Sequence, residues 1–160
     1  MAHPLREAVK ASFYPFAERA GFERLTGGGS VFANFRRSTG ELVDVFDIQW
    51  DKYSRPYFVI NFGQCRPQEE KDCRKPCRLQ RKRSGHLGSW FGLRKPFLEA
   101  LRTGRLTYTP DEVVAQLITW FPEAEAWWAT RAEGEHVYAP LLANNSFESR
   151  RSASATQLER

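Results

Sequence analysis

The sequence lacks any long apolar run. A membrane-spanning helix needs roughly 18 or more consecutive apolar residues, and no stretch of the 160 residues approaches that length without a charged side chain. The first residues, Met-Ala-His-Pro-Leu-Arg, also lack the apolar segment that a secretion signal carries. We therefore expect a cytoplasmic protein without a membrane-spanning segment.

Signatures of the common enzyme classes are missing too. The sequence has no G-x-S-x-G, no phosphate-binding glycine loop followed by lysine and no H-E-x-x-H. The run Gly27-Gly28-Gly29 fits a hairpin turn better than a phosphate cradle. Asp44 and Asp47 point to opposite faces of one predicted strand and so form no catalytic pair. We predict no cofactor, and an uncharacterised enzyme is the second of two alternatives to a binding function.

Cysteine is scarce. The three cysteines form an odd number, and together with the missing secretion signal this favours reduced thiols. With one histidine they make the pattern C-x7-C-x3-C-x8-H, whereas structural zinc sites usually contain a close pair such as C-x2-C. We predict no metal site, and we expect Cys73 to be exposed. The weak candidates for zinc ligands are Cys65, Cys73, Cys77 and His86.

The charge excess is confined to one segment. Residues 66–83 hold eight of the 24 basic residues and three of the 19 acidic ones, so they account for the whole net charge of +5. A nucleic-acid-binding domain usually spreads its basic side chains over several elements. We therefore expect a solvated charged loop, interrupted by Pro67 and Pro76. Phosphate or nucleic-acid binding by this segment, with Trp90 and Phe91 stacking on bases, is the first alternative function.

Alternation of apolar and polar residues predicts an antiparallel meander. A helix with apolar residues at helical spacing precedes it, kinked or divided at Pro15 and ended by Gly21. The period-two patterns predict a short strand and three longer ones, followed by the basic loop and one more strand. The expected strands cover residues 23–25, 31–37, 41–50, 57–64 and 85–91.

Helices are predicted for the C-terminal part. Residues 94–101 form a short helix, and Thr109-Pro110-Asp111-Glu112 combines an N-cap, a first-turn proline and the glutamate of a capping box. We expect Pro122 to end that helix and residues 123–131 to form a last one. Ser, Asn, Arg and Glu dominate the end of the chain, which predicts a disordered tail over 144–160.

These elements define the fold class as α+β. We expect an antiparallel β-meander of about four to five strands, packed on one face by the N-terminal and C-terminal helices. The chain length suits one hydrophobic core, so residues 1–143 are predicted to form a single domain that includes the basic loop 66–83.

The two faces of the predicted meander differ in composition. One is apolar and is expected to form the core: Val31, Ala33, Phe35, Leu42, Phe46, Ile48, Trp50, Phe58, Ile60 and Phe62. The opposite face mixes polar and apolar residues, which suits either the solvated side of an antiparallel sheet or a groove for a ligand or a protein. We predict that binding involves Arg36, Asp47, Gln49, Asn61, Arg81, Arg83 and Trp90.

A set of landmarks runs through most of the chain: Pro15, Gly21-Phe22, residues 32–36, 45–50 and 57–63, Cys77 with Arg81 or Arg83, and Trp90. Over about residues 5–130 they resemble the bacterial family of the domain of unknown function numbered 4304 (DUF4304). The resemblance implies an α+β fold and assigns no activity. Some members of that family look like neighbours of toxin systems, which implies an immunity-type binding role.

Together the observations favour a non-enzymatic binding module. The polar sheet face and the arginine-rich return after the basic loop are its expected contact surfaces. We expect the partner to be another protein and regard nucleic acid as the less favoured partner.

Overall fold

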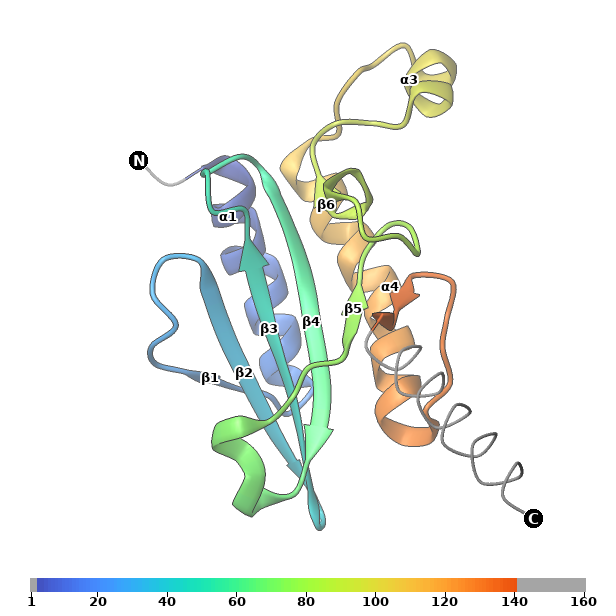
Figure 1. Cartoon of the computed structure of the whole chain (residues 1–160). Coiled ribbons are helices and arrows are strands. Elements are labelled where there is room, and N and C mark those ends of the chain that lie inside the picture. Colours follow the sequence, from blue (N-terminus) through green and yellow to red (C-terminus); the bar gives the residue numbers. More distant parts are fainter. Residues whose placement is uncertain (1–2, 141–160) are drawn as a thin grey trace, which may run out of the picture.

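The computed structural model describes residues 3–140, which form a twisted sheet with helices packed along one side (Figure 1). The predicted α+β class is confirmed. Residues 1–2 and 141–160 lie outside the described part, and so does the predicted tail over 144–160. Between residues 3 and 140, no helix has the length and apolar character required to cross a membrane.

The N-terminal helix is continuous but irregular. It consists of α1 (Pro4–Ala8), the π-helical η1 (Val9–Phe13) and α2 (Tyr14–Arg19). We expected a kink or a division at Pro15, and the structure instead widens the turn before it. Proline donates no N–H and its ring clashes with the carbonyl four residues earlier, so a π turn accommodates it. Gly21 ends the helix with φ at +91°.

Residues 3–140 contain seven strands in one antiparallel sheet, in the order β1-β2-β3-β4-β5-β7, with β6 pairing to β4 beside β5. The predicted meander corresponds to β1–β4. The later strands have only two or three residues each, too few to show a periodicity, and so the expected strand over 85–91 shrinks to β6. The bounds are β1 (Glu23–Leu25), β2 (Phe32–Thr39), β3 (Leu42–Trp50), β4 (Tyr57–Cys65), β5 (Cys77–Leu79), β6 (Phe91–Gly92) and β7 (Val137–Tyr138).

Two 3-10 turns and two further α-helices complete the described structure. They are the 3-10 turns η2 (Pro67–Asp72) and η3 (Leu87–Ser89) and the helices α3 (Phe97–Thr103) and α4 (Pro110–Thr130). The predicted capping box begins α4, because the N–H of Glu112 donates to the hydroxyl of Thr109 at 3.2 Å and the N–H of Thr109 donates to the Glu112 carboxylate at 2.7 Å.

Pro122 lies inside α4, so the prediction that it separates two helices is wrong. A proline within a helix costs about 3 kcal/mol through the lost hydrogen bond and the ring clash. The apolar stripe continues past it with Ala124, Trp127 and Trp128, all of which are buried. Burial of these side chains against the sheet offsets that cost.

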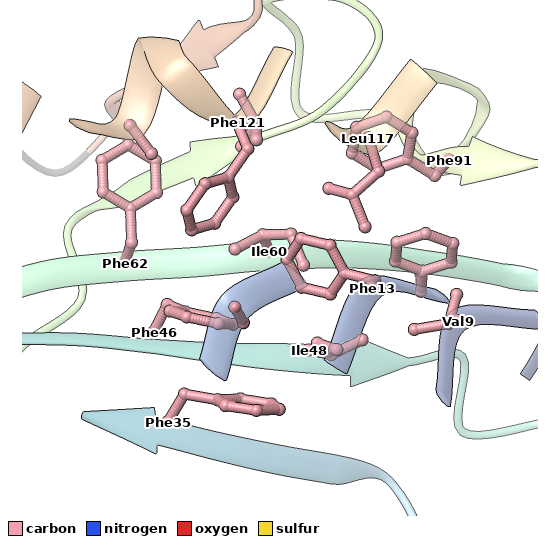
Figure 2. Packing of buried hydrophobic residues seen from close by; sticks show 14 of the residues in the cluster. Val9, Phe13, Phe35, Phe46, Ile48, Ile60, Phe62, Phe91, Leu117 and Phe121 are labelled. Atoms are coloured by element: carbon pink, nitrogen blue, oxygen red, sulfur yellow. The ribbon is translucent and has the colours of Figure 1, made fainter. Parts of the chain in front are cut away.

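The core lies between the inner face of the sheet and the helices. Figure 2 shows side chains of β2, β3 and β4 meeting Phe13 of the N-terminal helix and Phe121 of α4. Phe46 stacks on Phe35 with ring centroids 4.6 Å apart, and it meets Phe121 edge-on at 5.5 Å. Eight of the ten predicted inner residues are buried, and the two exceptions, Val31 and Leu42, lie at hairpin ends.

One charged side chain enters the inner face. Arg37 of β2 lies over the rings of Phe22 and Trp128, with its guanidinium carbon 4.2 Å and 5.5 Å from their centroids. Its Nη2 atom donates to Asp44 at 2.8 Å and to Glu125 of α4 at 2.6 Å. Asp44 is 1% exposed and also accepts a hydrogen bond from Gln64 at 2.6 Å, and the contacts of Arg37 with Asp44 and Glu125 connect the sheet to α4.

Replacing Arg37 with methionine is expected to lower the free energy of unfolding by about 3–5 kcal/mol, because Asp44 is left as a buried charge without its partner. Chemical denaturation measures this. Arg83→Met is the matched control, since it removes an exposed ion pair with Glu133 and should cost less than about 1 kcal/mol. The double variant Arg37→Met/Asp44→Asn should recover part of the loss, and equal costs for Arg37→Met and the control would contradict this account.

Candidate functional site

Residues 66–76, which we call the strap, cross the outer face of the sheet, the face that the helices leave open (Figure 1). A disulfide joins Cys65, the last residue of β4, to Cys73, with Cα atoms 5.7 Å apart. The predictions of reduced thiols and an exposed Cys73 are therefore wrong. The segment predicted as a charged loop over 66–83 contains the ordered elements η2 and β5. The turn through η2 brings the two cysteines within bonding distance, which sequence spacing alone does not reveal.

The strap is attached to the sheet by ion pairs as well. Glu70 accepts hydrogen bonds from Arg36 of β2, and Lys75 lies 3.2 Å from the Asp47 carboxylate of β3. The carbonyl of Arg74 lies directly against Gly63 of β4, where a Cβ would collide with it. Glycine at this position thus allows the strap to approach the strand backbone.

Four polar residues occupy neighbouring strands in register beneath the strap. Asn34 pairs with Asp47, Asp47 with Asn61, and Asn61 with Arg78. We call these four residues the polar row. The side-chain amide of Asn61 donates to the Asp47 carboxylate at 2.7 Å and to Gln49 at 2.9 Å, and Arg78 donates to Asn61 at 3.2 Å.

Asp47 is the centre of this cluster. It is 5% exposed, and burial raises the pKa of its carboxyl, while the hydrogen bond from Asn61 and the positive charges of Lys75 and Arg78 act in the opposite direction. A cavity of about 540 Å³ opens beside the cluster, between the strap and the strands β1–β3, with Leu25, Asn34 and Val45 among its lining residues.

The four candidate zinc ligands do not come together. Cys65 and Cys73 are bonded to each other, Cys77 is packed in the core and His86 is exposed. Within residues 3–140, no group of three or more His, Cys, Asp or Glu side chains is arranged to hold a metal ion. Burial raises the pKa of the Cys77 thiol to about 12, so it stays protonated at neutral pH.

A second site lies at the other end of the sheet, between β6 and the start of α4. It is a cavity of about 240 Å³, which we call the basic–aromatic pocket. Four cations and one carboxylate line it together with four aromatic rings: Arg81, Lys82, Arg94, Lys95, Glu99, Tyr57, Trp90, Tyr108 and Trp120. The predicted residues Arg81 and Trp90 meet here.

Arg81 is held in this pocket by neutral partners. Its guanidinium donates to the carbonyls of Gly92 at 2.6 Å and Arg94 at 3.3 Å and to the side chain of Gln116 at 3.0 Å. The guanidinium carbon lies 4.5 Å from the centroid of Tyr108. Burial lowers the pKa of Arg81, whereas burial and the hydrogen bond to Glu99 raise the pKa of Tyr108.

A third feature is residues 94–107, which we call the arm. Figure 1 shows α3 at the tip of this segment, away from the rest of the protein. The arm is closed at its base by the bridge between Arg94 and Thr107 and by backbone hydrogen bonds from Lys95 to Leu106 and from Tyr108 to Leu93. Four large apolar side chains of the arm are 72–79% exposed: Phe97, Leu98, Leu101 and Leu106.

The predicted site residues fall in three places. One group lies on the outer face beneath or beside the strap: Arg36, Asp47, Gln49 and Asn61. Arg81 and Trp90 line the basic–aromatic pocket. Arg83 lies apart, exposed and paired with Glu133 at 2.9 Å.

Several residues of these sites were not predicted. Lys95 and Tyr108 follow Arg81 by 14 and 27 residues in the chain, so no local pattern connects the three. The signal in the sequence for the apolar surface of the arm was ambiguous. Phe97, Leu98 and Leu101 share one side of a short helix, opposite Glu99, Arg102 and Thr103. This amphipathic pattern is equally typical of a helix packed against a core.

No protein-family model, curated protein or solved structure matches this chain. The resemblance to the domain of unknown function numbered 4304 therefore stays a hypothesis.

We expect one free thiol and one disulfide per chain. In non-reducing buffer at pH 8, the folded protein should react with no thiol reagent, because Cys77 is buried and protonated. Unfolding should release one reactive thiol, and reduction three. Closing this short loop should stabilise the fold by about 2–3 kcal/mol. Cys73→Ser should lower the free energy of unfolding by that amount in non-reducing buffer only, whereas Cys77→Ala keeps the disulfide and should remain sensitive to reductant. Three reactive thiols after unfolding without reductant would contradict the bond.

The buried carboxylate of Asp47 gives a pH dependence with a definite sign. The pKa of Asp47 is higher in the folded protein than in the unfolded chain, where an Asp titrates at about pH 4. The folded protein therefore loses stability at this group as pH rises from about 4 through the folded-state pKa. Asp47→Asn should therefore gain stability relative to the wild type between acidic and neutral pH in denaturation curves. Asp51 is the control of opposite sign, because hydrogen bonds from Arg55 lower its pKa and Asp51→Asn should lose stability. Because Asp47→Asn also removes the ion pair with Lys75, the test is the trend with pH: a difference in stability that moves in favour of the wild type as pH rises would contradict this reasoning.

Proposed function

We propose that the protein is a non-enzymatic interaction module that binds a partner protein through the arm. The observation that carries this proposal is the exposure of Phe97, Leu98, Leu101 and Leu106 on one ordered projection. Solvent-exposed apolar side chains occur singly on most surfaces. Helical spacing instead places Phe97, Leu98 and Leu101 on one side of α3, and such a group is typical of a contact surface.

The arm is held in shape, so its exposed face is available for binding without prior folding. The ammonium group of Lys95 donates to the hydroxyl of Thr103 at 2.9 Å, and that hydroxyl donates to the carbonyl of Glu99 at 2.9 Å. The Tyr108 hydroxyl donates to the Glu99 carboxylate and so connects α3 to the base of the arm. A preformed projection loses little conformational entropy on docking.

The charges around the apolar face indicate the chemistry of the partner. Arg94 and Arg102 are exposed and have no ion pair within residues 3–140, and Arg105 is paired only with Glu112. Arginine is enriched at protein interfaces because its planar group binds carboxylates in a bidentate manner. The expected partner therefore presents an apolar groove with acidic residues at its rim.

Two other occupants fit the arm less well. If a second copy of the chain docked arm to arm, the three arginines of one copy would lie close to those of the other, and their like charges would repel. A membrane surface is contacted preferentially by Trp and Tyr at the interface, and residues 94–107 contain neither. The immunity-type role implied by the family resemblance is one instance of this proposal, with a toxin as the acidic-rimmed partner.

The proposal is tested with the variant Leu98→Ser/Leu101→Ser and with Tyr53→Ser as a control, since Tyr53 is 68% exposed elsewhere on the surface. Immobilised wild type and control should retain a protein from the producing cells that the arm variant does not. That protein, once purified, should bind the arm variant about 100-fold more weakly in calorimetry, and Arg102→Glu should weaken binding and reduce its salt dependence.

Three outcomes would overturn the proposal. The first is a retained protein whose affinity the arm variant leaves unchanged. The second is a dimer of the purified chain, seen by sedimentation, that the arm variant dissociates. The third is arm-dependent binding to vesicles of anionic lipid. Circular dichroism of the variants should match the wild type, because the substituted side chains are exposed.

A further inference from the structure

The basic–aromatic pocket holds more positive charge than its surroundings compensate. Lys95 is 6% exposed, and within residues 3–140 neither Lys95 nor Arg81 forms an ion pair with a carboxylate. The only carboxylate among the lining residues, Glu99, accepts the hydroxyl of Tyr108. Buried charges are normally paired, so two uncompensated cations at one cavity point to a missing anion.

Both cations retain unused donors. A guanidinium has five N–H donors, and those of Arg81 make three hydrogen bonds to protein acceptors. An ammonium has three, and Lys95 uses one of them on Thr103. Two donors therefore remain on each side chain, which matches the several acceptor oxygens of a phosphate.

The remaining wall of the pocket is aromatic. Tyr57, Trp90 and Trp120 line it together with Tyr108, which lies beneath both Arg81 and Lys95. Flat π faces next to cations suit a ligand that combines a ring with a negative charge, because the ring stacks while the charge pairs. The cavity of about 240 Å³ fits a small molecule of this kind.

The other basic residues of the charged segment do not extend the pocket into a channel. Lys75 and Arg78 lie on the outer face, bound to Asp47 and Asn61, and Arg83 is paired with Glu133. A polynucleotide needs a continuous positively charged track along its backbone. The charge distribution instead suits a single phosphate group at one enclosed position.

We propose that the basic–aromatic pocket binds a mononucleotide-like ligand, with its phosphate at Arg81 and Lys95 and its ring on Trp90. This site adjoins the arm, since Arg94, Lys95 and Glu99 line it, but the exposed apolar residues that carry the proposed protein contact do not. Burial lowers the pKa of Arg81 although the nearby charge of Glu99 acts in the opposite direction, which agrees with a guanidinium that no carboxylate within residues 3–140 contacts directly.

The test uses adenosine monophosphate as the probe, with adenosine, ribose 5-phosphate and inorganic phosphate as parts of it. Quenching of tryptophan fluorescence and calorimetry measure binding to the full chain. Adenosine monophosphate should bind with a Kd below about 1 mM and more weakly at high salt. Each part alone should bind about 10-fold more weakly or worse, since each lacks either the ring or the charge.

Three variants identify the site. Lys95→Met should weaken binding of adenosine monophosphate about 10-fold or more. Its Tm without ligand should stay close to that of the wild type, because removal of a buried unpaired charge offsets loss of the hydrogen bond to Thr103. Trp90→Leu should weaken binding of adenosine monophosphate but leave binding of inorganic phosphate unchanged. Arg83→Met, in the same basic segment but outside the pocket, should change neither.

The proposal is overturned if no probe binds up to about 10 mM, or if Lys95→Met binds adenosine monophosphate as the wild type does. It is also overturned if single-stranded RNA binds tightly while the mononucleotide does not, or if Arg83→Met weakens binding as much as Lys95→Met. Because the Tm of Lys95→Met is measured in parallel, a loss of binding caused by misfolding is distinguished from a loss of the phosphate contact.

Discussion

Strand β3 is buried on both of its faces, and the rest of the structure follows from that double burial. Its inner residues need the helices as a cover, as in any sheet with one packed side. Its outer residues Val43, Val45 and Asp47 are buried as well, although they face away from the α-helices of the inner layer. A second cover is required, and the chain that connects β4 to β5 supplies it.

The outer cover differs in kind from the inner one. The inner side is a layer of interlocking aromatic rings whose stability scales with buried area. The strap is only 11 residues long and contributes little apolar area, so it depends on attachments: the bond between Cys65 and Cys73, the pairing of Glu70 with Arg36, and the close approach at Gly63. The two faces of the sheet therefore respond differently to reducing agents and to salt.

The long strands were predictable because eight or nine alternating residues separate an apolar from a polar face, as between Phe46 and Asp47. The short strands and the continuous helix through Pro122 were not predictable, because both depend on packing with distant parts of the chain. The same limit applies to the sites. The shared outer face of Arg36, Asp47 and Asn61 was predictable from alternation along their strands, and Asp47 and Asn61 pair directly in register. The pocket around Arg81 depends instead on how the chain returns through α4.

The arm leaves and rejoins the body at one point, because Arg94 and Thr107 face each other in its closing bridge. The path of the backbone through β6 and into α4 therefore depends on this bridge and on the residues next to it, such as Lys95. Changes in length or sequence at the tip of the arm, around residues 100–104, are expected to leave the sheet unchanged. The fold can consequently keep one scaffold while its recognition element diversifies, in the manner of a loop grafted onto a fixed frame.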